Sequence, residues 1–92
     1  MLDKETIFNA KSDTGASTGV KGEGRKISWQ IVISSATVQV QASNNGTTWY
    51  TTNSYTSTDF VSVDGNDALM WRLNVSANSG TVTAHQFISN LV

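Results

Sequence analysis

VQVQASNNGTTW, residues 38–49, joins a run of alternating apolar and polar residues to an Asn-Asn-Gly turn and a tryptophan. In an extended chain the two valines and the alanine fall on one side and the glutamines on the other, which predicts a strand buried on one face. Because Asn45 and Gly46 tolerate positive φ, we expect a tight hairpin turn that brings Trp49 back to the buried side. The stretch therefore predicts half of a β-hairpin.

Other parts of the chain show the same period of two, and none shows a helical period. The predicted strands cover residues 4–10, 27–33, 38–43, 47–52, 60–63, 69–76 and 81–88. We expect turns at Ser34-Ser35 and at residues 78–80, with the last strand pairing back on the one before it. A composition rich in Thr, Ser, Val and Asn agrees with this assignment. The fold class is all-β, a single small antiparallel β-sandwich or jelly roll of about seven strands formed by one domain, residues 1–92.

Residues 11–24 are rich in Gly, Ser and Thr and hold four of the seven glycines. They contain too few apolar residues to form part of a core, so we expect a long, flexible loop. Loops of this length in small domains are often functional or lie at an interface. A solvated surface loop is the alternative interpretation.

The charge pattern excludes several classes of partner. Six Lys/Arg against seven Asp/Glu give a net charge of −1, which is no electrostatic basis for binding nucleic acid or an anionic membrane. There is no apolar run of membrane-spanning length, no cysteine and no signal peptide at the N-terminus. Residues 27–58 carry no charge, so hydroxyl and amide groups keep them in solution or a partner covers them.

Few residues have the chemistry of a catalytic or metal site. His85 is the single histidine, and no nucleophile-elbow motif accompanies it, so we expect no enzyme activity and no cofactor. Asp64, Asn66 and Asp67, with Asp59 nearby, have oxygen ligands suited to calcium. Their spacing is not that of an EF-hand, and a turn requires the same residue types, so we predict a turn and no metal site.

The aromatic residues divide by phase. Trp29, Trp49 and Trp71 share the phase of the aliphatic residues of their strands, which predicts core packing. Tyr50 has the opposite phase to Trp49, and Tyr55 lies in a polar segment, so these two tyrosines are candidates for a partner surface.

Several other apolar residues are out of phase with the core or lie in the C-terminal tail. Together with the tyrosines they predict an exposed apolar patch, and such patches often mark protein interfaces. The candidate interface residues are Val32, Tyr50, Tyr55, Phe60, Met70, Phe87, Leu91 and Val92.

Two segments of the chain carry a hairpin motif and a late Arg-bearing strand motif. Their residues are Val38, Val40, Ser43, Asn45, Gly46, Trp49, Val63-Asp64-Gly65, Arg72-Leu73-Asn74-Val75 and Ser79-Gly80-Thr81-Val82. These motifs resemble those of small phage virion structural proteins of the β-sandwich type, in which a Gly-rich N-terminal loop precedes the hairpin and the Arg-bearing strand. The resemblance covers most of the chain. The same hairpin and Arg-bearing strand are also similar to discoidin-like, galactose-binding-like jelly rolls, although the residues of their ligand-bearing loops have no match in this chain.

The virion resemblance implies a non-enzymatic protein that is made in the host cytoplasm and incorporated into the virion. We expect a capsid decoration or cement subunit that bridges major capsid proteins, using the 11–24 loop and the terminal segments as arms. It also implies a homo-oligomer, with a trimer suited to the three-fold sites of a capsid lattice. The alternatives are a tail-tip or fibre adhesion module that binds a carbohydrate, and a tail or adaptor component. Glycan binding is expected only under the adhesion alternative.

Overall fold

The structure is a computed structural model and describes residues 3–90. Its elements are β1 (Asp3–Lys11), β2 (Gly15–Ala16), β3 (Val20–Lys21), β4 (Arg25–Ser43), β5 (Tyr50–Tyr55), β6 (Asp59–Asp64), the 3-10 turn η1 (Gly65–Asp67) and β7 (Met70–Asn90). All seven strands belong to one antiparallel sheet, which confirms the all-β prediction. Among these residues no helix is long and apolar enough to cross a membrane.

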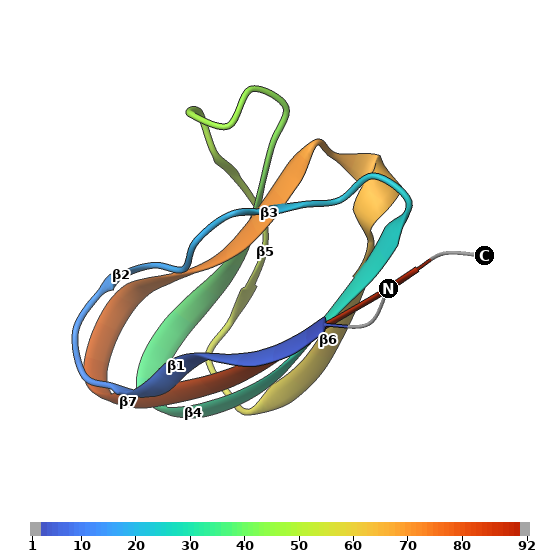
Figure 1. Cartoon of the computed structure of the whole chain (residues 1–92). Helices are drawn as coiled ribbons and strands as arrows, with labels where there is room; N and C mark the ends of the chain where they lie inside the picture. The colour runs from blue at the N-terminus through green and yellow to red at the C-terminus, as the bar shows by residue number, and fades with distance from the viewer. Residues whose placement is uncertain (1–2, 91–92) are drawn as a thin grey trace.

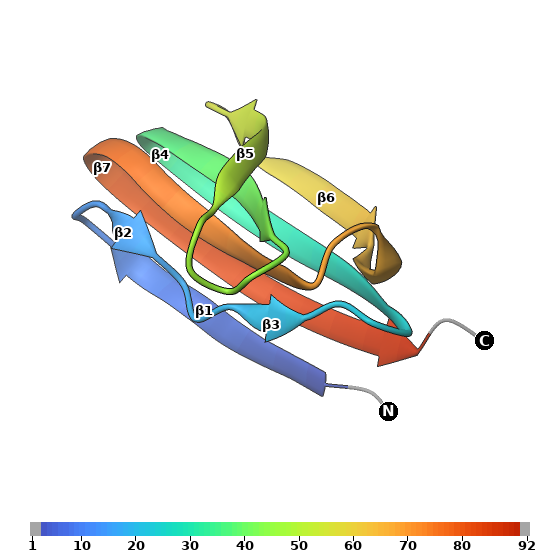
Figure 2. The ribbon, with the colours of Figure 1, turned by 90° about the horizontal axis from the view of Figure 1, so that it is seen from above.

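Two long strands, β4 and β7, organise the molecule. They lie antiparallel along almost their whole length, and both bend near the middle, so that the sheet folds over on itself (Figures 1 and 2). Layer 1 consists of β1, β6, residues 25–34 of β4 and residues 81–90 of β7. Layer 2 consists of β2, β3, β5, residues 36–43 of β4 and residues 70–77 of β7.

The bends lie where the sequence predicts turns. In β4 the buried positions change from odd to even numbers across Ser34 and Ser35, and Ser35 adopts a left-handed φ of 55°. In β7 the register with β4 shifts at the same level, and a Cβ on Gly80 would lie 2.0 Å from the Ser34 carbonyl oxygen. The predicted turns at Ser34-Ser35 and at residues 78–80 are therefore wrong, because the chain continues in the same direction there and passes into the other layer.

This continuity also corrects the predicted pairing of the last strand. Residues 81–90 pair with residues 25–34 of β4, and do not fold back on residues 69–76. Ile27 lies opposite Ile88 in layer 1, whereas Val40 lies opposite Leu73 in layer 2. Each layer therefore receives half of each long strand.

The core lies between the two layers and draws its side chains from both. The buried apolar residues are Phe8, Ile27, Trp29, Ile31, Ala36, Val38, Val40, Val61, Trp71, Leu73, Val75, Val82, Ala84 and Ile88. Trp29 and Trp71 are core residues, as their phase predicts, and each indole N–H has an acceptor. Trp29 Nε1 donates to Gln86 Oε1 at 2.9 Å, and Trp71 Nε1 donates to the Gly65 carbonyl at 3.0 Å. Both tryptophans are therefore buried without leaving a polar group unpaired.

Residues 11–24 are not the free loop that their composition predicts. β2 and β3 pair with the edge of β7 in layer 2, and the Ser17 hydroxyl accepts a hydrogen bond from Leu73 N at 3.0 Å. At the end of the segment, Gly22 packs against the backbone of Gly65 so closely that a Cβ on either residue would clash with the other's carbonyl oxygen. The segment is an edge of the sheet, since its backbone supplies hydrogen bonds that β7 would otherwise lack.

The connection between β4 and β5 is longer than the predicted two-residue turn. It spans residues 44–49, and only Gly46 within it has positive φ, at 78°. The extra residues place Trp49 outside the core, where its ring stacks on the Arg72 guanidinium at 4.2 Å from the ring centroid. The predicted core position of Trp49 is wrong because it depends on counting the phase through a turn of the wrong length.

Candidate binding surfaces

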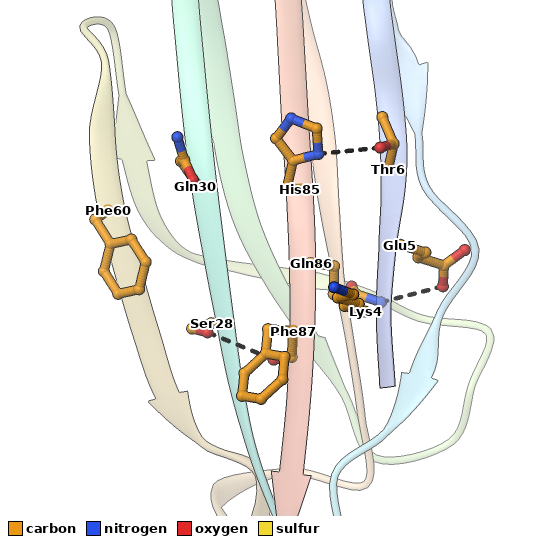
Figure 3. Close-up of a pocket in the computed structure, with 9 residues that line it drawn as sticks. All are labelled: Lys4, Glu5, Thr6, Ser28, Gln30, Phe60, His85, Gln86 and Phe87. Atoms are coloured by element: carbon orange, nitrogen blue, oxygen red, sulfur yellow. Dashed lines mark hydrogen bonds between the residues drawn. The ribbon is translucent and has the colours of Figure 1, made fainter. Parts of the chain in front are cut away.

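Apolar side chains are exposed on the outer face of layer 1. Phe60 is 66% exposed, Val32 45% and Phe87 41%. Phe60 is opposite Gln30 and Phe87 is opposite Ser28, so β4 contributes polar side chains between two phenyl rings (Figure 3). Strand alternation places all five residues on the outer face of one layer.

The space between the rings is a shallow depression of about 440 Å³, lined mainly by residues of β1, β4, β6 and β7. We refer to Ser28, Gln30, Phe60, His85 and Phe87 as the aromatic trough. His85 Nδ1 forms a hydrogen bond of 3.0 Å with the Thr6 hydroxyl on β1, and the Ser28 hydroxyl lies 3.5 Å from the Phe87 carbonyl oxygen that accepts from it. The trough thus combines two aromatic rings with hydroxyl, amide and imidazole groups, which suits a protein or peptide surface.

The structure separates the remaining predicted interface residues. Tyr50 is 71% exposed but lies at one end of layer 2, away from the trough residues. Tyr55 is half-buried and packs against the core, opposite Val38. Met70 is half-buried near Gly46. Leu91 and Val92 lie outside the described residues.

The outer face of layer 2 carries a polar network that sequence reasoning did not identify. Arg72 Nε donates to Gln41 Oε1 at 2.8 Å, and Gln41 Nε2 donates to Gln39 Oε1 at 3.3 Å. Asn74 Nδ2 donates to the same Gln39 oxygen at 3.0 Å. Trp49 covers the guanidinium, and partial burial lowers the pKa of Arg72, although arginine remains charged. A signal was present in the sequence, because both strands place long polar side chains two residues apart on the outer face.

The acidic turn after β6 has a structural role. Asp64 Oδ1 accepts from Asn66 N at 2.9 Å and so caps η1, and Asn66 Oδ1 accepts from Gly24 N at 2.7 Å. In residues 3–90 no three His, Cys, Asp or Glu side chains gather closely enough to hold a metal ion. The side chains of Asp64 and Asn66 are therefore used to fix the turn against the 11–24 segment.

Comparison with known proteins reveals a likeness in structure alone. No protein-family model and no curated protein sequence matches this chain. The crystal structure of SPBc2 prophage-derived protein YomS superposes on it with a TM-score of 0.73, over 97% of this chain and 96% of that chain, at 14% sequence identity. The two chains share a fold. The similarity to discoidin-like motifs stays a prediction, since the likeness to YomS does not test it.

Proposed function

We propose that this chain is a non-enzymatic structural protein of a phage virion, and that it decorates the capsid by attaching the aromatic trough to the major capsid protein. The observation that best supports this attachment surface is the exposure of Val32, Phe60 and Phe87 together on one face. Its phage origin is supported by the full-length fold likeness to a prophage-derived protein.

The trough has the features of a protein-binding surface. Exposed phenyl rings gain from leaving water, by roughly 1.5–3 kcal/mol for complete burial of one phenylalanine. Interfaces favour aromatic residues at their centres and polar groups at the rim. Because a capsid repeats the same contact at every lattice position, a weak contact per copy is sufficient for a stable layer.

A binding role is favoured over a catalytic one by the surroundings of His85. Its one hydrogen bond among the described residues joins it to Thr6, and it lies on an open face. A hydrolytic site requires a nucleophile, a base and a group that orients the base, close together and shielded from water. The proposal also includes self-association, with a trimer at capsid three-fold sites as the specific form.

The test is the number of copies of this chain in purified particles of the phage that encodes it, measured by quantitative mass spectrometry against the major capsid protein. Hundreds of copies in a simple ratio to the capsid protein are expected. A handful of copies would assign it to the tail or an adaptor, and absence from particles would overturn the virion proposal.

The attachment surface is tested separately by adding purified variants to particles that lack the chain. Phe60→Ser combined with Phe87→Ser should abolish loading. Leu69→Ser is the matched control, because Leu69 is 48% exposed but does not line the trough. Equal loading of both variants would show that the trough is not the attachment surface.

A further inference from the structure

A second depression lies at the end of layer 2, where residues 44–49 face the segment that follows η1. It has a volume of about 370 Å³, within the range of roughly 300–1,000 Å³ found for small-molecule pockets. The polar and aromatic residues that line it include Asn44, Asn45, Thr48, Tyr50 and Asp67. None of them lines the aromatic trough.

The wall formed by residues 44–49 is fixed by its own hydrogen bonds. The Ser43 hydroxyl accepts from Gly46 N at 2.9 Å, and Asn45 Oδ1 accepts from Thr47 N at 2.9 Å and Thr48 N at 2.8 Å. Such side-chain-to-backbone bonds hold a loop in one conformation. The groups on this wall are therefore placed before any ligand arrives, which lowers the entropic penalty of binding.

A further bond joins the two walls and orients an amide. Asn44 Oδ1 accepts from Leu69 N at 2.9 Å, which connects residues 44–49 to the segment after η1. Since the oxygens of Asn44 and Asn45 accept backbone N–H groups, their Nδ2 groups remain as donors, and no hydrogen bond within residues 3–90 uses either one. Two amide donors therefore lie at the depression without a protein acceptor.

An aromatic ring and a carboxylate also line the depression. Tyr50 is the most exposed large apolar side chain in the described part of the chain, at 71%. Asp67, the last residue of η1, also lines the depression, and its carboxylate accepts no hydrogen bond from any residue in 3–90. An exposed ring, an unpaired carboxylate and two amide donors around one depression are the convergent groups expected of a binding site.

These groups match the chemistry of a sugar. One face of a pyranose ring presents C–H groups that pack on an aromatic ring, while its hydroxyls donate to carboxylates and accept from amides. No Lys or Arg lines the depression, and Asp67 repels a second negative charge. We propose that this depression binds a neutral saccharide, with Tyr50 stacking on the ring, Asp67 accepting from hydroxyls and the two asparagines donating to hydroxyls.

The site is independent of the proposed attachment to a capsid, because it uses other residues at the end of the other layer. A small sugar on an open site with one aromatic ring should bind weakly, with a Kd of about 1 mM or more. A layer of many copies would multiply such weak contacts against a glycan-coated surface. A decorated particle would then present its saccharide sites on the side of each copy that does not hold the capsid.

The experiment is an NMR titration of the isolated full chain, labelled with ¹⁵N, against glucose, galactose, mannose, rhamnose and N-acetylglucosamine. Glucuronic acid serves as the charged comparison. We expect saturable shift changes in residues 44–50 and 67–69 with at least one neutral sugar, and weaker binding of the acid. Tyr50→Ala should weaken binding by about tenfold or more, whereas Tyr50→Phe, which keeps the ring, should bind nearly as well.

Two further variants sharpen the result. Asp67→Asn should weaken binding of the neutral sugar and reduce the discrimination against glucuronic acid, since the repelling charge is gone. Phe60→Ala is the matched control, because Phe60 is almost as exposed as Tyr50 but lies in the trough; it should leave binding unchanged. Absence of saturable shifts with all five neutral sugars, or shifts that Tyr50→Ala does not alter, would overturn the proposal. Neither result depends on where the chain lies in a virion.

Discussion

The two layers share the long strands β4 and β7, yet their outer faces have opposite character. On layer 2, Arg72, Gln41, Gln39 and Asn74 are joined to one another by a chain of hydrogen bonds. On layer 1, by contrast, the phenyl rings of the trough are partly exposed to water, Phe60 at 66% and Phe87 at 41%. The comparison shows that a β-sandwich can use the polar side chains of one outer face for hydrogen bonds within the domain, while apolar side chains on the other outer face stay exposed and available to a partner.

The largest loss of stability is expected from a change at the bend where the two layers are joined, because both layers depend on that bend. Gly80→Ala places a Cβ 2.0 Å from the Ser34 carbonyl oxygen, and the atom that must move is backbone. We expect a loss of about 3 kcal/mol in the free energy of unfolding, measured by urea denaturation. Gly24→Ala is the control, since Gly24 has open space and only its φ of 70° is unfavourable, which should reduce stability by about 1 kcal/mol. Equal effects of the two would contradict the close approach at the bend.

A smaller loss of stability is expected from disrupting the hydrogen-bond network on the outer face of layer 2. Arg72→Met removes the hydrogen bond to Gln41 and the stack on Trp49, so we expect a loss of about 1–2 kcal/mol in urea denaturation. Lys26→Met also replaces a cationic side chain with methionine, at an exposed position of β4 in layer 1, where the effect should stay within about 0.5 kcal/mol. If both variants have the same stability, the network on layer 2 does not stabilise the fold.

Substitutions on the outer face of layer 1 should have little effect on the stability of the isolated domain. Phe60→Ser with Phe87→Ser should lower the free energy of unfolding by no more than about 1–2 kcal/mol in total, because Phe60 is 66% exposed and Phe87, although more covered, is still 41% exposed. Thermal unfolding followed by circular dichroism measures this. A large destabilisation would show that the two rings stabilise the fold. Loss of capsid loading by the same variant would then be explained by unfolding and would not identify the attachment surface.

The smallest effect concerns the salt bridge at the end of β1, outside both faces. Lys11 donates to Asp13 at 2.7 Å, and this hydrogen bond, together with the charge of Lys11, lowers the pKa of Asp13 from its usual 3.8. A lowered pKa in the folded state contributes stability above the ordinary pKa, and this contribution is lost as pH falls through the folded value. Because the carboxylate is exposed to water, Asp13→Asn should barely flatten the decline in thermal midpoint below pH 4. A pronounced flattening would show that the pair is stronger than its exposure implies.

Much of the fold could be predicted because burial on one face of a strand leaves a period of two in the sequence. Ile27, Trp29 and Ile31 and then Val38, Val40 and Ala42 are predicted to face the core; the structure buries the first five and half-buries Ala42. The change of phase between them is also visible in the sequence, where it suggests a turn. When the buried positions change from odd to even, the opposite side of the strand faces the core. A turn produces this change, and so does a bend that carries the strand into a second layer.

The candidate surfaces were predictable only in part. Val32, Phe60 and Phe87 are identified as exposed because each is out of phase with its strand, but their meeting on one face depends on the register of β6 and β7 against β4. The position of Trp49 depends on the length of the loop after β4, which no local pattern specified. Register and loop length are set by pairing between distant segments, so local alternation does not contain them.

By itself the sequence determined that this chain forms strands, which residues of the stretches 27–31 and 38–40 face the core, and that the 64–67 segment turns. Those properties depend on the alternation of neighbouring side chains and on the conformational preferences of Asp, Asn and Gly. Only the tertiary structure decided that β4 and β7 each serve both layers, that residues 11–24 form a sheet edge, and that Tyr50 and Asp67 share a depression. These features arise from contacts between residues far apart in the chain, whose free energy depends on how the whole sheet folds over its core.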